Sequence, residues 1–187
     1  MIAYKINVAD KNAEDNIAKM LIKDELIQEN TLILCLGTGF SVADLLGPLT
    51  GTLINKNKKS LNISLCGTLN SPIHTLNIES NLENFKKDKL HILTIDSVLS
   101  FKQDVGHLYL RDHPITYGKS SKTNLPLKIG NTSINCIVAD KLEYTLLEKP
   151  VIKLKEVYTF AKVISNSIIK AKRELHNKKR LRLYLYR

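Results

Sequence analysis

The sequence predicts an α/β domain built on a mostly parallel central sheet. Three short apolar runs contain no Asp, Glu, Lys or Arg: Thr31 to Leu36, Leu61 to Cys66 and Leu90 to Ile95. Continuous apolar runs of this kind are typical of strands that are covered on both faces, as strands of parallel sheets are. Stretches with helical spacing separate the runs, and this alternation is typical of α/β folds.

The first half reads as a helix, a strand, a tight turn and a second helix. From Ala13 to Gln28 the apolar residues recur with a helical period. The first apolar run then leads into Gly37-Thr38-Gly39, which predicts a tight turn. A helical pattern resumes from Ser41 to Ile54, with the Ser41 hydroxyl available as an N-cap.

The second half adds two strands and two helices. A polar helical stretch, Leu76 to Asp88, precedes the third apolar run, and Val105 to Leu110 and Ser133 to Val138 are further predicted strands. A long amphipathic helix is expected from Val151 to Lys172. Between the last two strands, Pro114 to Gly130 is rich in Gly, Pro, Ser, Thr, Asn and Lys, and an ordered loop of this length usually has a function.

Length and composition indicate a single domain. A chain of 187 residues can bury a core without a metal or a disulfide. We expect residues 1–30 to be a helical segment, 31–172 the α/β core and 173–187 a basic C-terminal tail. The three cysteines lie in apolar runs, which favours buried thiols in a reducing compartment. Neither a signal peptide nor a membrane-spanning run is evident, so we expect a cytoplasmic protein with no membrane partner.

The net charge of +10 suggests an acidic partner, but much of the excess lies in one segment. This segment is Lys170 to Arg187, KAKRELHNKKRLRLYLYR. Such runs are usually solvated helix ends or tails. The alternative is that the segment contacts nucleic acid without sequence specificity, through its phosphates.

Two aspartates follow buried strands of the predicted sheet. Asp44 comes in the turn and first helical stretch after the first strand, and Asp96 directly follows the third; Thr68 and His74 come after the second. Ligands of open parallel sheets bind beyond the carboxyl ends of the strands. Two carboxylates facing each other there would share a proton, because each charge raises the pKa of the other, and this suits the activation of water.

Each of these residues also has a structural interpretation. Asp44 can complement the dipole at a helix N-terminus, and Asp96 can cap a helix that follows it. His74 is more often a hydrogen-bonding loop residue than a ligand, although a His beside two carboxylates completes a divalent-metal site, Asp44, Asp96 and His74. His113 is a weaker candidate for the same role.

Several other active-site classes are excluded by their missing signatures. Gly37-Thr38-Gly39 lacks the third glycine of a dinucleotide fingerprint, and no phosphate-binding Gly-Lys-Ser/Thr follows it. No cysteine pair has zinc-site spacing, and no serine lies in a nucleophile elbow. A hydrolase that uses two carboxylates remains.

Motifs along most of the chain resemble a known family. The matching positions include Leu36-Gly37-Thr38, Ser41, Asp44, Gly47-Pro48-Leu49, Gly51-Thr52, Gly67-Thr68-Leu69, Pro72, His74, Asn77, Ile95-Asp96, Pro114, Gly118, Lys122, Leu125-Pro126 and Gly130. In this order they resemble the YyaC-type sporulation family, a relative of the spore germination protease and, more remotely, of the hydrogenase maturation peptidases. The resemblance covers roughly Leu32 to Ala171.

The resemblance implies a three-layer α/β/α sandwich and a role in sporulation or germination. It also implies that Asp44 and Asp96 match the two aspartates of the germination protease, whose substrates are small acid-soluble spore proteins. The expected function is therefore an aspartate-dependent endopeptidase acting on an acidic spore protein, in the forespore or mother cell. Thr38, Ser41, Thr68, His74 and Lys122 are expected to line the site. We expect that no cofactor is required. The alternative, implied by the resemblance to the hydrogenase maturation peptidases, is that the site binds a divalent metal.

One departure from the family favours a different class of function. Gly39-Phe40 stands where the family usually has Asp-Arg, so an ionisable neighbour of the site is missing. The alternative is a catalytically inactive protein that binds a spore protein or nucleic acid, in the cleft or through the basic tail. The sequence leaves the oligomeric state open.

Overall fold

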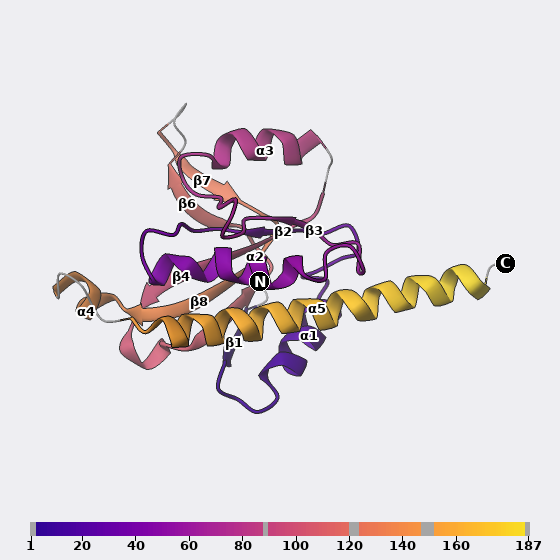
Figure 1. The fold of residues 1–187 in the computed structure, drawn as a ribbon, viewed down its shortest axis with the longest axis horizontal. Coiled ribbons are helices and arrows are strands. Elements are labelled where there is room, and N and C mark those ends of the chain that lie inside the picture. Colours follow the sequence, from indigo (N-terminus) through magenta and orange to yellow (C-terminus); the bar gives the residue numbers. More distant parts are fainter. Residues whose placement is uncertain (1–2, 88–89, 120–123, 147–151, 186–187) are drawn as a thin grey trace.

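A six-stranded sheet runs through the middle of the molecule (Figure 1). Its strands in spatial order are β1 (Ala3–Asn7), β5 (His107–Arg111), β8 (Thr132–Asp140), β4 (Ile92–Ser100), β2 (Leu32–Cys35) and β3 (Ser64–Cys66). The last four are mutually parallel, whereas β5 is antiparallel to β8 and β1 to β5. The computed structural model describes residues 3–87, 90–119, 124–146 and 152–185, and it confirms the predicted α/β fold with a mostly parallel sheet.

The other elements form a layer on each side of the sheet (Figure 1). One layer contains α1 (Ala13–Lys23), the single turn η1 (Ala43–Leu45) with α2 (Leu46–Asn55), and α5 (Leu154–Leu185). The other contains α3 (Ile78–Lys87) and a hairpin of β6 (Ile115–Lys119) and β7 (Pro126–Ile129). The short η2 (Lys102–Asp104) and α4 (Lys141–Leu146) lie at the sheet's end. The arrangement is a three-layer sandwich.

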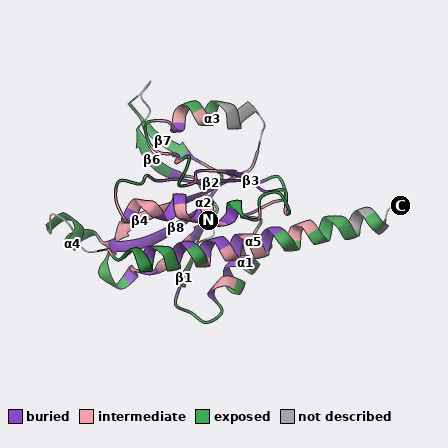
Figure 2. Ribbon diagram, viewed as in Figure 1, coloured by how far each residue is buried: buried purple, intermediate pink, exposed green. Residues whose placement is uncertain are grey.

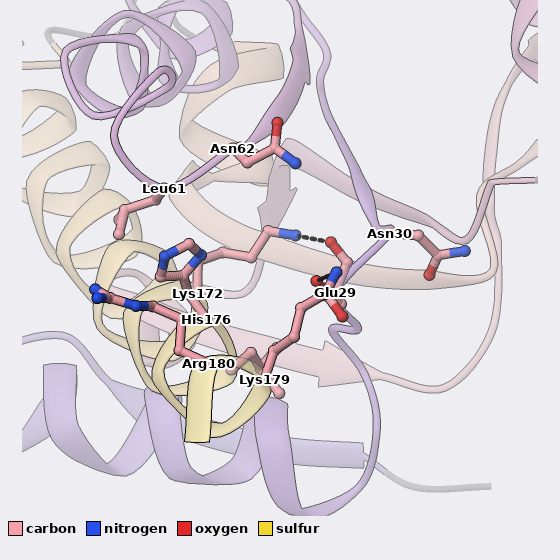
Figure 3. Close-up of a pocket in the computed structure, with 9 residues that line it drawn as sticks. Glu29, Asn30, Leu61, Asn62, Lys172, His176, Lys179 and Arg180 are labelled. Carbon is pink, nitrogen blue, oxygen red and sulfur yellow. Dashed lines mark hydrogen bonds and ion pairs between the residues drawn. The ribbon is translucent and has the colours of Figure 1, made fainter. Parts of the chain in front are cut away.

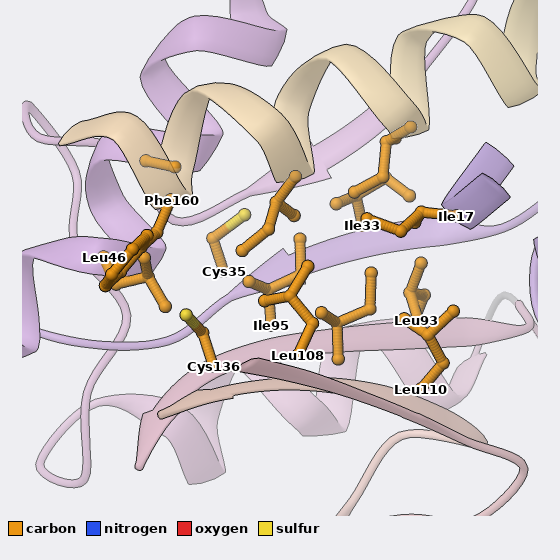
Figure 4. Packing of buried hydrophobic residues seen from close by; sticks show 14 of the residues in the cluster. Ile17, Ile33, Cys35, Leu46, Leu93, Ile95, Leu108, Leu110, Cys136 and Phe160 are labelled. Carbon is orange, nitrogen blue, oxygen red and sulfur yellow. The ribbon is translucent and has the colours of Figure 1, made fainter. Parts of the chain in front are cut away.

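The alternation of side chains along the strands separates an apolar face from a partly polar one. In β4, Leu93 and Ile95 join the main core under α2 and α5, and Cys35, Leu108 and Cys136 of the neighbouring strands do the same (Figure 4). Burying each large aliphatic side chain stabilises the fold by roughly 1.5–3 kcal/mol. Residues one position away point to the other face.

That other face is covered over only part of its width. Leu34 and Ile92 pack there with Ile78 of α3 and with Ile115 and Ile129 of the hairpin. This second cluster lies over β2 and the start of β4. Toward β8 and β5 the same face carries polar residues, which leaves it available to a ligand.

Four segments differ from the sequence prediction. The N-terminal segment 1–30 holds β1 as well as a helix. The loop Pro114–Gly130 contains β6 and β7, because Ile115 and Ile129 are buried and anchor a hairpin. The strand β4 continues through Ser100, so Asp96 lies inside it. Finally, residues 173–185 continue α5.

The far end of α5 extends past the rest of the molecule (Figure 2). Leu175 still packs partly against the main core, whereas the described side chains from Asn177 onward are exposed. No described helix combines the length and the apolar character needed to cross a membrane. The expected cysteine burial is seen for Cys35 and Cys136, and all three thiols are free.

Candidate active site

The turn between β2 and α2 is tight because two glycines allow its parts to touch. A Cβ on Gly37, whose φ is +140°, would lie 2.2 Å from the backbone oxygen of Asp44. A Cβ on Gly47 would lie 1.9 Å from the backbone oxygen of Leu36. Real Cβ atoms do not approach backbone atoms so closely, so these positions require glycine. They bring the first turn of the helical segment, with Asp44, against the end of β2.

Asp44 is held by Thr38 and Ser41. The Thr38 backbone N–H donates to Asp44 Oδ2 at 2.7 Å, and the Thr38 hydroxyl donates to the same oxygen at 2.6 Å. The Asp44 backbone N–H in turn donates to Ser41 Oγ at 3.2 Å, as expected of an N-capping serine. One carboxylate oxygen is therefore fixed by two short bonds, which orients the other.

Asp96 lies in the middle of β4, just beyond the point where its neighbour β2 stops. The last register pair of the two strands is Cys35 with Ile95, and the Leu36 N–H still donates to the Ile95 oxygen at 2.8 Å. On its other side β4 remains paired, with Asp96 opposite Asn135 of β8. The prediction that a strand ends at Asp96 is wrong, and so is the alternative that Asp96 caps a following helix, because β4 continues for four residues beyond Asp96.

The two carboxylates interact electrostatically. Burial raises the pKa of Asp96 to about 7, and the negative charge of Asp44 contributes to the rise, while a hydrogen bond from the Ser97 backbone offsets part of it. The pKa of Tyr117 in β6 is also raised, first by burial and then by the charges of Asp96 and Asp44. The structure thus places a phenol near both aspartates.

A cleft of about 480 Å³ opens beside Asp96, on the part of the sheet that α3 and the hairpin leave uncovered. Its lining residues come from three strands of the sheet and the start of the hairpin: Asp96, Val98, Ser100, Tyr109, Arg111, Pro114, Ile115, Thr116, Asn135 and Ile137. Clefts of this size are typical of small-ligand or peptide sites. Asp44 is not among the lining residues, so the cleft reaches the pair from the side of Asp96.

Two cleft residues stand out by their unused polar groups. Asn135 is 5% exposed, and its Oδ1 atom is buried without a hydrogen-bond partner. Buried polar atoms normally have partners, so this one calls for an explanation. The Arg111 guanidinium lies 5.3 Å from the Tyr109 ring centroid and makes no ion pair with a described residue. A free guanidinium in a cleft attracts carboxylates.

Sequence reasoning missed Tyr109, Arg111, Asn135 and Tyr117. Tyr109 and Asn135 lie in predicted strands and Arg111 directly follows one, and only pairing across β5, β8 and β4 places these three residues beside Asp96. Tyr117 lies in the segment expected to be a loop. The polar character of Asn135 within an otherwise apolar strand was the available signal.

His74 and Thr68 have local structural roles. The Leu76 N–H donates to His74 Nδ1 at 3.3 Å, and the His74 backbone oxygen accepts from Asn77 and Ile78 at the start of α3. Thr68 exchanges backbone hydrogen bonds with Ser71 in a tight turn. These contacts match the loop interpretation of His74.

The divalent-metal site predicted from Asp44, Asp96 and His74 requires three ligands that lie together. Within residues 3–87, 90–119, 124–146 and 152–185, no group of three or more His, Cys, Asp or Glu side chains is arranged to hold a metal ion. His74 therefore does not complete a site with Asp44 and Asp96, although the two aspartates remain close enough to interact. Lys122, the remaining predicted site residue, lies outside the described residues.

Comparisons with known proteins give one family match, one relative in sequence and one solved structure with a similar fold. A family model described as "Protein of unknown function (DUF1256)" matches residues 5–167. The "Uncharacterized protein YyaC" of Bacillus subtilis (strain 168) is 29% identical over 143 residues, which are 73% of this chain and 67% of that protein. The crystal structure of a [NiFe] hydrogenase maturation protease HycI from Thermococcus kodakarensis KOD1 has a TM-score of 0.49 and 17% identity, covering 79% of this chain and 97% of that one. The family match spans both aspartates and the cleft strands.

Proposed function

The chain belongs to the family described as "Protein of unknown function (DUF1256)", and we propose that it is a peptidase in which Asp44 and Asp96 activate water. The observation that carries the proposal is the pKa of Asp96, raised to about 7 by burial and by the charge of Asp44. An acid with such a pKa exchanges protons at neutral pH, which is the requirement for general acid/base catalysis. The sequence resemblance to the germination protease supports the same reaction.

The two environments suggest different roles for the two carboxyl groups. Asp44 Oδ2 accepts both hydrogen bonds of Thr38 and so acts only as an acceptor. Protonated Asp96 has an O–H, and its register partner Asn135 has an acceptor oxygen that lacks a donor. We therefore assign the base to Asp44 and the acid to Asp96. Pairs of acids whose environments differ in this way commonly divide these roles.

The proposed hydrolysis conserves protons over one turnover. Asp44 takes a proton from water as the water oxygen forms a bond to the peptide carbonyl carbon. The carbon–nitrogen bond then breaks, and Asp96 donates its proton to the leaving nitrogen. The products are a carboxylic acid and an amine, and transfer of the proton from Asp44 to Asp96 restores the starting state. Such proton transfers typically contribute 10²- to 10⁴-fold to the rate.

The cleft is compatible with an acidic polypeptide substrate. A chain lying across the uncovered face would reach Asp96 and place an acidic side chain near Arg111, which has no described carboxylate partner. The net charge of +10 would favour the encounter with an acidic protein. We propose a small acid-soluble spore protein as this substrate, and the cytoplasm of the forespore or mother cell as the place of reaction.

The test is cleavage of purified small acid-soluble spore proteins, with the products identified by mass spectrometry. Wild type should generate new termini, and Asp44→Asn and Asp96→Asn should each abolish them. Asp10→Asn, which changes an exposed aspartate that does not line the cleft, is the matched control and should cleave normally. Parallel reactions with EDTA, Mg²⁺ and Zn²⁺ decide whether a metal assists.

A second function is favoured by one observation, the side chain of Phe40. It is 95% exposed, at a position where the resembled family usually has an ionisable residue near the site. In this alternative the chain binds the spore protein without cleaving it. Absence of cleavage under every metal condition, together with saturable binding that Arg111→Gln weakens, would establish the alternative and reject the peptidase.

A further inference from the structure

A second cleft lies at the opposite end of the parallel strands from the aspartate pair. Its volume is about 560 Å³, and it is formed where α5 passes the residues that precede β2 and β3 (Figure 3). The lining residues are Glu29, Asn30, Leu61, Asn62, Lys172, Leu175, His176, Lys179 and Arg180. Because these lie at the amino ends of the strands, the cleft is separate from the site of Asp44 and Asp96.

A buried ammonium group lies against the floor of this cleft. Lys172 is 3% exposed, and its Nζ donates to the backbone oxygens of Gln28 at 3.1 Å and of Glu29 at 2.7 Å. Burial lowers the pKa of Lys172 to about 8, with the charge of Glu29 opposing the effect, so the group is still largely charged at neutral pH. An ammonium has three hydrogens, and these two bonds use two of them.

The positive charge of the cleft is incompletely neutralised. Lys179 forms an ion pair with Glu29, the single carboxylate in the lining. Arg180 and His176 make no hydrogen bond or ion pair with a described residue. Figure 3 shows both side chains beside Leu61, with the Lys172 side chain reaching toward Glu29. At neutral pH three cationic side chains, Lys172, Lys179 and Arg180, therefore face one anion, an excess that a dianion would balance.

The other residues that line the cleft indicate which chemical groups the ligand has besides its negative charge. Leu61 and Leu175 provide an apolar surface, and the amides of Asn30 and Asn62 can each donate and accept hydrogen bonds. A bare inorganic ion would leave this surface unused. A phosphate monoester is close to a dianion at neutral pH, and its organic group would cover the leucines.

We propose that this cleft binds a phosphate monoester attached to a ring, of the nucleoside monophosphate type. Arg180 and His176 contact the phosphate, Lys172 supplies positive potential from below, and the ring packs on Leu61 and Leu175. All five α5 residues of the lining lie beyond residue 167, where the family match ends. The site is thus independent of the proposed peptidase.

Isothermal titration calorimetry on the full chain tests the proposal with AMP, inorganic phosphate and adenosine as probes. AMP should bind more tightly than either fragment, because it engages both the cations and the leucines. Arg180→Gln should weaken AMP binding about tenfold or more, the usual effect of losing a hydrogen bond to a charged group. Asn62→Asp, which adds a negative charge to the opposite wall, should weaken it similarly.

Lys178→Gln is the matched control. It removes the same charge from α5, but Lys178 pairs with Glu174 and does not line the cleft. Its affinity for AMP should stay within about twofold of wild type, since exposed charges act weakly at this range. Equal losses in Lys178→Gln and Arg180→Gln would overturn the proposal, because the attraction would then come from the overall charge. Absence of AMP binding, or adenosine or phosphate binding as tightly as AMP, would overturn it too. Thermal unfolding of each variant checks that the fold is intact.

Discussion

Two buried charged groups lie near opposite ends of β2, and burial moves their pKa values toward neutrality from opposite sides. At the carboxyl end, burial raises the pKa of Asp96 to about 7, and the like charge of Asp44 acts in the same direction. At the amino end, burial lowers the pKa of Lys172 to about 8, and the opposite charge of Glu29 acts against the shift. The neighbouring charges differ in their effect: that of Asp44 adds to the shift that burial causes in Asp96, whereas that of Glu29 limits the shift in Lys172.

The strongest test of the carboxyl end is Asp96→Asn. Asparagine keeps the shape of the side chain but can neither carry nor accept the catalytic proton, so any peptidase activity should fall by about 10²- to 10⁴-fold. The rate of product formation, measured by mass spectrometry with Asp10→Asn in parallel, checks this. Undiminished cleavage by Asp96→Asn would remove Asp96 from the mechanism and leave its raised pKa a structural consequence of burial.

The same substitution should change the pH dependence of stability. Because the folded-state pKa of Asp96 is raised, its contribution to stability is fully present below about pH 4 and is lost as the pH rises to about 7. Asp96→Asn does not incur this loss. The difference in unfolding free energy between variant and wild type should therefore grow in favour of the variant by a few kcal/mol from pH 4 to pH 7.

Urea unfolding at several pH values measures this difference. Asp44→Asn is an informative companion, because removing the like charge should lower the pKa of Asp96 and shrink the effect. A difference between Asp96→Asn and wild type that stays constant with pH would show that Asp96 ionises normally in the folded protein.

The contribution of Lys172 to stability should change with pH in the opposite direction, and over a higher pH range. Its folded-state pKa is lowered to about 8, so between pH 8 and about 10.5 the unfolded chain binds more protons than the folded one, and stability rises with pH. Wild type should therefore gain up to roughly 3 kcal/mol relative to Lys172→Met across this window. The measurement is the difference in unfolding free energy between the two proteins at pH 7, 9 and 10. Parallel pH curves for the two proteins would contradict it.

At both ends of β2 the sequence predicts the strands and turns better than the chemical roles of the side chains. Apolar runs identify β2 and β4, because burial on two faces removes charged residues from a strand. Glycine positions predict the tight turn that holds Asp44, since a Cβ at Gly37 or Gly47 would collide with backbone. What sequence periodicity cannot supply is strand order. Only the pairing of β4 with β8, and of β8 with β5, brings Asn135, Tyr109 and Arg111 beside Asp96.

Side-chain roles were hardest to predict where a residue has a local partner. His74 is used in the turn that begins α3, and Thr68 in the turn with Ser71. Thr38 contacts Asp44 directly, because it lies in the same short turn. Lys172 was expected to be part of a solvated basic segment, yet carbonyl oxygens from the chain before β2 enclose it. Charge runs therefore conceal single buried cations.

The smallest expected effect concerns the exposed end of α5, and it distinguishes the contribution of this end to stability from that of Lys172. Deleting residues 177–187 removes the ion pair of Lys179 with Glu29, whose side chains are about half exposed, and exposed pairs contribute at most about 1 kcal/mol. The melting temperature should therefore change by only a few degrees, because Lys172 and Leu175 remain in place. Binding to DNA should lose much of its salt dependence, since each lost phosphate contact reduces the slope by about one. A large fall in melting temperature would mean that the end of the helix is packed against something, whereas an unchanged salt slope would place any DNA contact elsewhere on the surface.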